Sequence, residues 1–346
     1  MRTDQAGTKP LLRVLGGNRE AIPPIWMMRQ AGRYLPEYRA VREKAGGFLD
    51  LCLTPELAAE VTLQPVRRFG FDAAILFSDI LIVPYALGRK LWFVEGEGPR
   101  LEPMDVGDIG RLRAELDWNI VARVYDAASQ VSARLAGSPT ALIGFCGAPW
   151  TVATYMIAGR GSADQAVAKE FAKRQPEAFA QLIDILVEAS ADYLAKQSEC
   201  GAQVVQIFDS WAGSLAVEDF ERWCVQPTKR LLAKLRAKGR NPKIIGFPRG
   251  AGKNIPRYVE QTGVDAVSLE SGIDRDFARA EIQSRVPVQG NVDPQILLAG
   301  GDALDREVDD VLEKLGQGPL IFNLGHGILP QTPIANVERM LRKVRG

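Results

Sequence analysis

The chain has 346 residues, 46% of them hydrophobic and 25% charged, with a formal net charge of +1. This composition is typical of a globular protein with a large core. The near-zero charge argues against a general nucleic-acid or membrane-surface partner. The four cysteines, Cys52, Cys146, Cys200 and Cys224, include no CxxC pair, so we interpret them as reduced core residues rather than disulfides or metal ligands.

No segment predicts export or membrane insertion. Residues 1–20 lack the apolar stretch of a signal peptide. The apolar stretch at 73–87 is interrupted by Ser78, Asp79 and Pro84, which makes it too short and too polar to span a bilayer. We therefore expect a cytoplasmic protein, with residues 1–10 flexible.

Short apolar runs alternate along the chain with longer segments of helical period. Continuous apolar runs of this length favour strands that are buried on both faces of a parallel sheet. The eight candidate strands are Pro24–Met28, Asp72–Phe77, Ala141–Phe145, Gln203–Phe208, Lys243–Phe247, Ala266–Leu269, Pro287–Gln289 and Leu320–Asn323.

The intervening segments are predicted to be helices. Thr54-Pro55-Glu56 has the residues of a helix start, and Thr332-Pro333 opens a last helix with a basic end. The other predicted helices are Leu57–Phe69, Pro176–Cys200, Val217–Lys238 and Ala303–Leu315. Eight strand–helix units predict an α/β fold, a single (β/α)8 barrel over residues 1–346, with its longest insertion at Val83–Pro103.

Polar residues follow the predicted strands, where barrels of this kind carry their active sites. Strands must also end in polar turn residues, so position alone is weak evidence. These residues are Arg29, Asp79, Gly147-Ala148-Pro149-Trp150, Asp209-Ser210, Pro248-Arg249, Glu270-Ser271, Asn291–Asp293 and Gly325-His326.

The segment Trp26–Arg39 is the most informative one. Arg29 and Arg33 flank Gly32, which permits close approach of the backbone to a ligand. Each guanidinium can bind a carboxylate through two hydrogen bonds. A solvated basic loop is the alternative interpretation of the same residues.

Several motifs in this chain resemble those of uroporphyrinogen decarboxylases, in the same order and across most of the sequence. They are Arg29–Arg39, Phe77–Leu81, Gly144–Gly159, Phe208–Gly213, Gln289–Pro294 and Asn323–Gly327.

The resemblance implies a substrate and a reaction. The substrate would be uroporphyrinogen, a flexible macrocycle of four pyrroles with eight carboxylates, whose four acetates become methyl groups in coproporphyrinogen. The family needs no metal or organic cofactor, because a protonated pyrrole ring itself accepts the electrons that carbon dioxide leaves behind. The resemblance also implies a two-fold homodimer.

The resemblance assigns roles to individual residues. Asp79 would accept hydrogen bonds from the pyrrole N–H groups and stabilise the cation that forms on protonation. Arg29 would bind a substrate carboxylate and is a second catalytic candidate, although a guanidinium is a poor acid. The remaining substrate-binding residues are Gln30, Ala31, Gly32, Arg33, Arg42, Tyr155, Ser210 and His326.

Structural roles compete with several of these assignments. Asp79 could be a helix cap, Tyr155 a packing residue in a turn, Ser210 a turn residue, and His326 a structural histidine. Pro248-Arg249-Gly250 matches no functional residue of the family, and Gly159–Ser162 is a lid or an ordinary loop.

Two other functions are open. A methyltransferase of the same superfamily would use zinc and a corrinoid or thiol partner, but His326 is the sole histidine and no His-x-Cys motif occurs. A non-catalytic tetrapyrrole-binding protein would keep the arginines but would not need Asp79.

Overall fold

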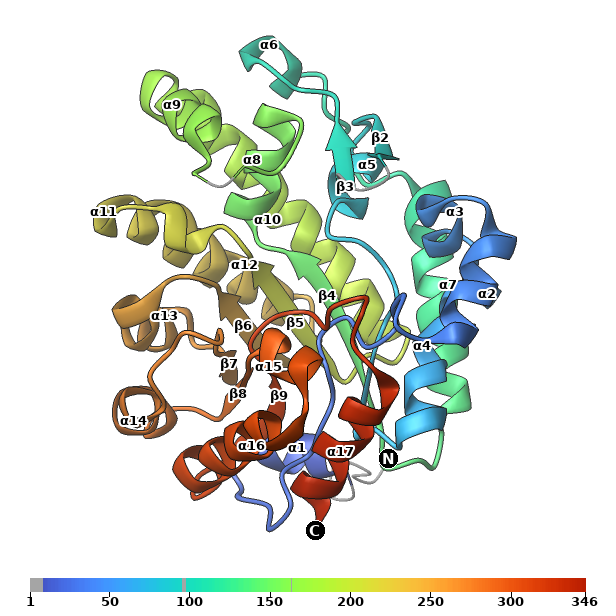
Figure 1. Ribbon diagram of the computed structural model, residues 1–346. Coiled ribbons are helices and arrows are strands. Elements are labelled where there is room, and N and C mark those ends of the chain that lie inside the picture. Colours follow the sequence, from blue (N-terminus) through green and yellow to red (C-terminus); the bar gives the residue numbers. More distant parts are fainter. Residues whose placement is uncertain (1–8, 95–97, 163) are drawn as a thin grey trace.

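The computed structural model describes residues 9–94, 98–162 and 164–346. Within these residues, seven parallel strands form one sheet in the order β1-β4-β5-β6-β7-β8-β9 (Figure 1). The strands are β1 (Ala73–Ile75), β4 (Ala141–Gly147), β5 (Val204–Asp209), β6 (Lys243–Pro248), β7 (Ala266–Ser268), β8 (Val288–Val292) and β9 (Leu320–Leu324).

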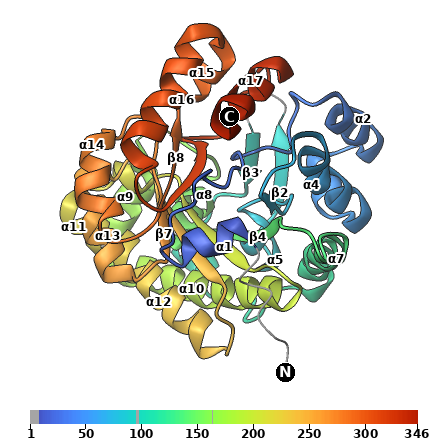
Figure 2. The same ribbon diagram turned by 90° about the horizontal axis from the view of Figure 1, so that it is seen from below.

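The sheet is curled, and helices surround it (Figure 2). Gln206 on β5 and Gln289 on β8 are separated by two strands, yet Gln289 Nε2 donates to Gln206 Oε1 at 3.2 Å. Trp26 Nε1 donates to Gln289 Oε1 at 2.9 Å, so the segment before the first named strand also reaches this interior. These side chains are fully buried and hydrogen-bonded to one another, although Gln206 Nε2 has no partner among the described residues.

The segment Pro24–Met28, predicted to be the first strand, is not a regular strand in the structure. It forms an isolated bridge from Ile25 to Phe322 instead of a named strand. Pro23 and Pro24 lack the N–H groups that a ladder needs. The Met27 and Met28 N–H groups donate to the side chains of Gln30 (3.1 Å) and Asn323 (2.9 Å). The described sheet therefore has seven strands rather than the predicted eight.

The predicted helices are present with small shifts of their ends. The helix predicted at Val217–Lys238 contains a π-helical turn at Glu221–Val225. The helices of the first half are α1 (Pro10–Leu15), α2 (Pro36–Ala45), α3 (Phe48–Cys52), α4 (Pro55–Phe69), α5 (Ile82–Ala86), α6 (Val106–Ile109), α7 (Trp118–Arg134), α8 (Pro149–Ala158), α9 (Ala166–Arg174) and α10 (Pro176–Glu199). Those of the second half are η2 (Ala212–Ser214), α11 (Val217–Phe220), η3 (Glu221–Val225), α12 (Gln226–Ala237), η4 (Gly252–Asn254), α13 (Ile255–Thr262), α14 (Arg275–Phe277), η5 (Ala278–Gln283), α15 (Pro294–Ala299), α16 (Gly301–Leu315) and α17 (Ile334–Arg345).

Two regions bear on the remaining predictions. Within Val83–Pro103 an antiparallel pair forms from β2 (Leu91–Val94) and β3 (Gly98–Leu101), and residues 95–97 between them lie outside the described residues. Of the segment 1–10, predicted to be flexible, residues 1–8 also lie outside. Lys9 is buried, and its Nζ donates to the Thr140 carbonyl (2.8 Å) and to Gln203 Oε1 (2.7 Å), while Pro10 begins α1.

The cysteines are free thiols, as the sequence predicts. Cys52, Cys146 and Cys224 are buried, and Cys200 is half-buried. In the part of the chain that the structure describes, no helix is long and apolar enough to cross a membrane.

Candidate active site

The carboxyl ends of the parallel strands bring most of the predicted site residues to one edge of the sheet. Asp79 follows β1, Tyr155 lies in the helix after β4, and Ser210 directly follows β5. His326 follows β9, and Arg29 ends the segment that bridges to β9. Tyr155 is helical rather than in the predicted turn, because Pro149 begins α8 directly after β4.

Arg29 occupies a special backbone position. Its φ is +63°, in the left-handed region that non-glycine residues rarely adopt. The side chain is exposed and packs against the backbone of Gly327, where a Cβ would come within 2.8 Å of Arg29 Cγ. The turn thus directs a charged side chain towards the segment that carries His326.

The residues of the predicted Gln30–Arg33 stretch differ in how much of each is exposed to solvent. Gln30 is fully buried; its Nε2 donates to the Ala73 carbonyl at 3.0 Å and its Oε1 accepts from Met27 N–H. Ala31 and Gly32 are half-buried, and Arg33 is exposed. The Gln30 N–H also donates to the Met27 carbonyl at 3.0 Å. This fully buried residue therefore holds the turn against β1 and exposes no atom to a ligand in this structure.

Asp79 lies near Arg29 and Tyr155. Its Oδ1 accepts a hydrogen bond from Leu81 N–H at 2.8 Å. Burial raises the pKa of Asp79, while the Leu81 hydrogen bond and the charge of Arg29 act against that rise. Burial also raises the pKa of Tyr155, and the Asp79 charge adds to it. An acid, a cation and a phenol are therefore near enough to influence one another.

His326 is neutral in this environment. Burial, followed by the charges of Arg29 and Arg249, lowers its pKa to about 4. Its Nδ1 accepts a hydrogen bond from Gly327 N–H at 2.6 Å. Since a neutral imidazole that accepts at Nδ1 carries its proton on Nε2, His326 presents one N–H donor to a ligand.

Arg42 and Arg33 lie near two buried residues, Cys52 and Tyr38. Burial and the Asp79 charge raise the pKa of Cys52, whereas Arg42 lowers it. Burial raises the pKa of Tyr38 to about 12, against the charges of Arg42 and Arg33. Arg42 is half-buried and donates to the Gly46 carbonyl at 3.1 Å. Arg42 and Asp79 are therefore both near Cys52, whereas Arg33 is linked to Tyr38 alone.

A hydrogen-bond network fixes the segment around Ser210. Thr151 Oγ1 donates to Asp209 Oδ1 at 2.6 Å and accepts from Trp211 N–H at 3.1 Å. The Trp211 ring centroid lies 6.3 Å from that of Tyr155. Ser210 is thereby placed between two anchored residues, and it is half-buried.

The Gly159–Ser162 loop lies over this network. A Cβ at Gly161 would be 3.0 Å from Tyr155 Oη and 3.2 Å from the Trp211 ring. The loop is therefore in contact with the predicted substrate-binding tyrosine. Whether it moves as a lid stays a prediction.

The arginines at this edge lack acidic partners. Across residues 9–94, 98–162 and 164–346, Arg29, Arg33 and Arg249 form no ion pair. Arginines elsewhere commonly pair, as Arg257 does with Glu221 (2.9 Å) and Arg339 with Asp305 (2.7 Å). Guanidinium groups that have no acidic partner can bind the carboxylates of an anionic ligand.

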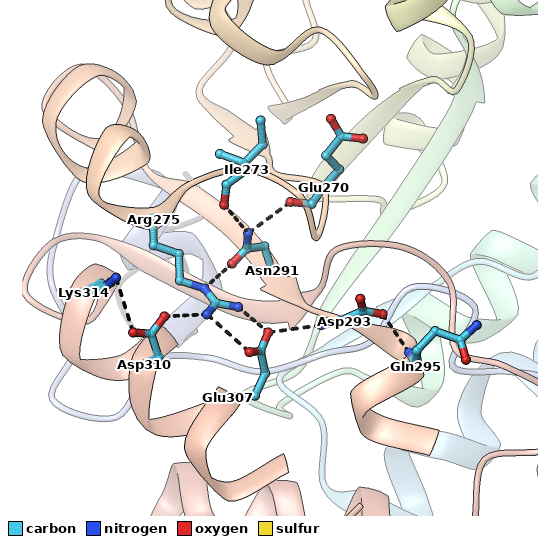
Figure 3. Close-up of polar contacts among 9 residues, drawn as sticks. All are labelled: Glu270, Ile273, Arg275, Asn291, Asp293, Gln295, Glu307, Asp310 and Lys314. Atoms are coloured by element: carbon cyan, nitrogen blue, oxygen red, sulfur yellow. Dashed lines mark hydrogen bonds and ion pairs between the residues drawn. The ribbon is translucent and has the colours of Figure 1, made fainter. Parts of the chain in front are cut away.

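Arg275 shows the opposite arrangement (Figure 3). Its guanidinium donates to Asn291 Oδ1 (2.8 Å), to Asp310 (2.5 Å) and to Glu307, and its side chain is only 11% exposed. The Asn291 amide in turn donates to the carbonyls of Glu270 (3.0 Å) and Ile273 (3.2 Å). This fully paired arginine anchors the loop after β7 rather than binding a ligand.

The sequence analysis placed Arg249 at a strand end but assigned it no function. It directly follows β6, it is half-buried, and its charge acts on His326. Its position at a strand end was the available signal, but no family motif covered it. In the described part of the chain, no group of three or more His, Cys, Asp or Glu side chains could hold a metal ion.

Comparisons with known proteins agree on one family. The family model described as uroporphyrinogen decarboxylase (URO-D) matches residues 7–346. The uroporphyrinogen decarboxylase of Brucella anthropi is 56% identical over 338 residues, covering 98% of each chain. That of Brucella suis is also 56% identical over 98% of each chain.

Solved structures with lower identity share the fold. A methyltransferase from Methanosarcina mazei has a TM-score of 0.77 and 21% identity over 97% of this chain and 96% of its own. A B12-independent methionine synthase from Shewanella sp. W3-18-1 has a TM-score of 0.55 and 10% identity, over 84% and 85% of the two chains. At these identities the similarity concerns architecture alone.

Proposed function

Because this chain belongs to the uroporphyrinogen decarboxylase family, we propose that it removes carbon dioxide from the four acetates of uroporphyrinogen III to give coproporphyrinogen III. It is thus a carboxy-lyase of tetrapyrrole biosynthesis. The observation that supports this activity most directly is the placement of Asp79 beside Arg29, at an edge where several arginines lack acidic partners.

The reaction at each acetate replaces a carboxylate by a proton. A proton adds to the pyrrole carbon next to the acetate and makes the ring cationic. The bond between the acetate methylene and the carboxyl carbon then breaks, its electron pair flows into the ring, and carbon dioxide leaves. Protonation of the methylene carbon and loss of the ring proton give a methyl group and restore the pyrrole.

Asp79 is the residue that stabilises the cation in this proposal. Its Oδ1 is held by Leu81 N–H, so the carboxylate is oriented before the substrate arrives. Pyrrole N–H groups become stronger donors when the ring is protonated, and the carboxylate therefore binds the transition state better than the substrate. Arg29, next to Asp79, binds a substrate carboxylate; the proton donor itself is left open.

The other residues bind the carboxylates and the macrocycle. Arg33 and Arg42 supply permanent positive charge, and His326 supplies a neutral N–H donor. Tyr155 and Ser210 supply hydroxyl groups at the carboxyl ends of β4 and β5. In the Gln30–Gly32 stretch the half-buried Ala31 and Gly32 contact the substrate, and the fully buried Gln30 supports the turn that carries them.

The proposal includes a closed (β/α)8 barrel in one domain, residues 1–346. Segment 24–28 would close it, and hydrogen bonds on both of its sides support this. Phe322 N–H donates to the Pro24 carbonyl at 2.9 Å, and Asp72 N–H donates to the Ile25 carbonyl at 2.9 Å. We further propose a cytoplasmic homodimer that needs no metal or organic cofactor.

The test is anaerobic incubation of the purified chain with uroporphyrinogen III, followed by oxidation and separation of the products by carboxyl number. We expect successive loss of carboxyl groups down to the tetracarboxylate. Activity should survive exhaustive chelation and dialysis. Unchanged octacarboxylate would contradict the function, and activity restored only by zinc or an organic cofactor would contradict the cofactor-free mechanism.

A further inference from the structure

We propose that Arg249 binds a substrate carboxylate other than that of the acetate being decarboxylated. This inference rests on the proposed function and extends it to a residue that the family motifs do not cover. It concerns binding of the substrate, not the chemical step.

The backbone of Arg249 is fixed at the edge of the sheet. Its N–H donates to the Asp209 carbonyl at 3.1 Å, at the end of β5, and its carbonyl accepts from Gly213 N–H at 2.8 Å. Gly213 also packs on Gly250, where a Cβ on Gly213 would lie 2.5 Å from the neighbouring Cα. The backbone of Arg249 is therefore held in place beside Ser210.

The side chain of Arg249 lacks the partners that a structural arginine has. It is half-buried, and within the described residues it forms no ion pair. Arg275, which begins α14 after β7, is by contrast neutralised by Glu307 and Asp310. A partly desolvated guanidinium without an acid is electrostatically suited to an incoming carboxylate, which its planar fork can bind through two hydrogen bonds.

The positive charge of Arg249 matters because the neighbouring His326 carries none. His326 is neutral near pH 7, since its pKa is lowered to about 4 by burial and by Arg29 and Arg249. It can donate one hydrogen bond to a ligand but cannot neutralise an anion. Arg249 provides the permanent positive charge on the β6 side of His326.

The carboxylate that Arg249 binds is not the one that leaves. Arg29 is the cation whose charge acts on Asp79, and Asp79 faces the reacting pyrrole in the proposed mechanism. Arg249 follows β6, whereas Asp79 follows β1, and the strands β4 and β5 lie between these two in the sheet. Arg249 is therefore farther from the reacting ring, and a macrocycle with eight carboxylates can reach it with another substituent.

The test compares steady-state kinetics of the full chain and its variants on the first decarboxylation of uroporphyrinogen III under anaerobic conditions. Arg249→Ala should raise KM about tenfold to a hundredfold, the effect of losing one charged hydrogen-bonding partner. Its kcat should stay within about twofold, because the contact is equal in substrate and transition state. Arg249→Lys should restore only part of the affinity.

Lys253→Ala is the matched control, since Lys253 is an exposed cation of the same β6–α13 connection. It should leave KM unchanged. An equal rise of KM in both variants would mean general attraction by positive charge and would overturn a specific contact.

Two results separate this inference from the proposed function. A wild-type chain without decarboxylase activity would refute the function itself. An active wild type whose Arg249→Ala variant keeps its KM, or loses kcat at unchanged KM, would refute only the role of Arg249. Circular dichroism and thermal unfolding of each variant show that the fold is retained.

Discussion

The side chain of Arg29 lies against the backbone of Gly327, so that a methyl group at position 327 would overlap Cδ of the arginine. The contact joins the turn after segment 24–28 to the segment after β9. It explains why a glycine follows His326: any side chain at this position would displace the arginine next to Asp79.

Gly327→Ala should therefore lower kcat/KM by about tenfold or more, because a displacement of about 1 Å at a catalytic group is costly. The φ of Gly327 lies outside the left-handed region, so the effect would be steric and not a result of backbone strain. Gly272→Ala is the control, since no atom lies within 4 Å of the added Cβ. Anaerobic reaction rates at low substrate concentration give kcat/KM for both variants. Equal kcat/KM for Gly327→Ala and Gly272→Ala would show that the position of Arg29 does not depend on a glycine at 327.

Arg33→Ala should mainly weaken substrate binding. Losing one charged hydrogen-bonding partner costs roughly 1.5–3 kcal/mol, which corresponds to about a tenfold to hundredfold rise in KM. Arg33→Lys should recover only part of this, because an ammonium cannot form the bidentate contact. Arg33 is exposed, and an unchanged KM in the Ala variant would identify it as a solvated basic residue.

Asp209→Asn should alter how stability depends on pH. Burial raises the pKa of Asp209 to about 6 from its usual 3.8. A raised folded-state pKa gives stability that is present below pH 3.8 and is lost as the pH rises through 6. The free energy of unfolding of the variant, relative to wild type, should therefore rise by about 2 kcal/mol between pH 4 and pH 8.

Urea unfolding at a series of pH values measures this difference. Because Asn keeps an oxygen that can accept from Thr151, the 2.6 Å hydrogen bond need not be lost. A difference that stays constant with pH would show that Asp209 is ionised as easily in the folded chain as in the unfolded one.

Arg275→Gln should destabilise the chain by about 3 kcal/mol or more, because it leaves Glu307 buried without its counter-charge. The double variant Arg275→Met/Glu307→Leu should be less destabilised than this single variant, since it removes both charges. Urea midpoints compare the two. If the double variant is the less stable one, the ion pair contributes more through its attraction than its desolvation costs.

The sequence predicted the parts of this fold that are encoded locally. The strands from β4 to β6 and β9 were found because they are continuous apolar runs, and α10 because its pattern is long and free of glycine. The rule that polar residues at strand ends form the site led to Asp79, Ser210 and His326, which the structure places at one edge.

Features that depend on distant partners could not be read from the sequence. Segment 24–28 has an apolar pattern, but the N–H groups of Met27 and Met28 donate to the side chains of Gln30 and Asn323 instead of to a neighbouring strand. Whether an arginine is neutralised depends on acidic residues far along the chain, as Arg275 depends on Glu307 and Asp310. The helical position of Tyr155 is an exception, because Pro149 at the start of its helix is a local signal.

The most direct test of the mechanism is the kcat of Asp79→Asn with saturating uroporphyrinogen III under anaerobic conditions. The amide keeps an oxygen that can accept from Leu81 N–H, as Oδ1 of Asp79 does at 2.8 Å, and removes only the charge. We predict that kcat falls by about two to three orders of magnitude, while KM changes little. Asp79→Glu, which keeps the charge but moves it, should retain partial activity. A near-normal kcat for Asp79→Asn in a folded variant would contradict the account: Asp79 would then be a cap for Leu81, and another acid, with Asp209 and Asp293 the next candidates, would stabilise the cation.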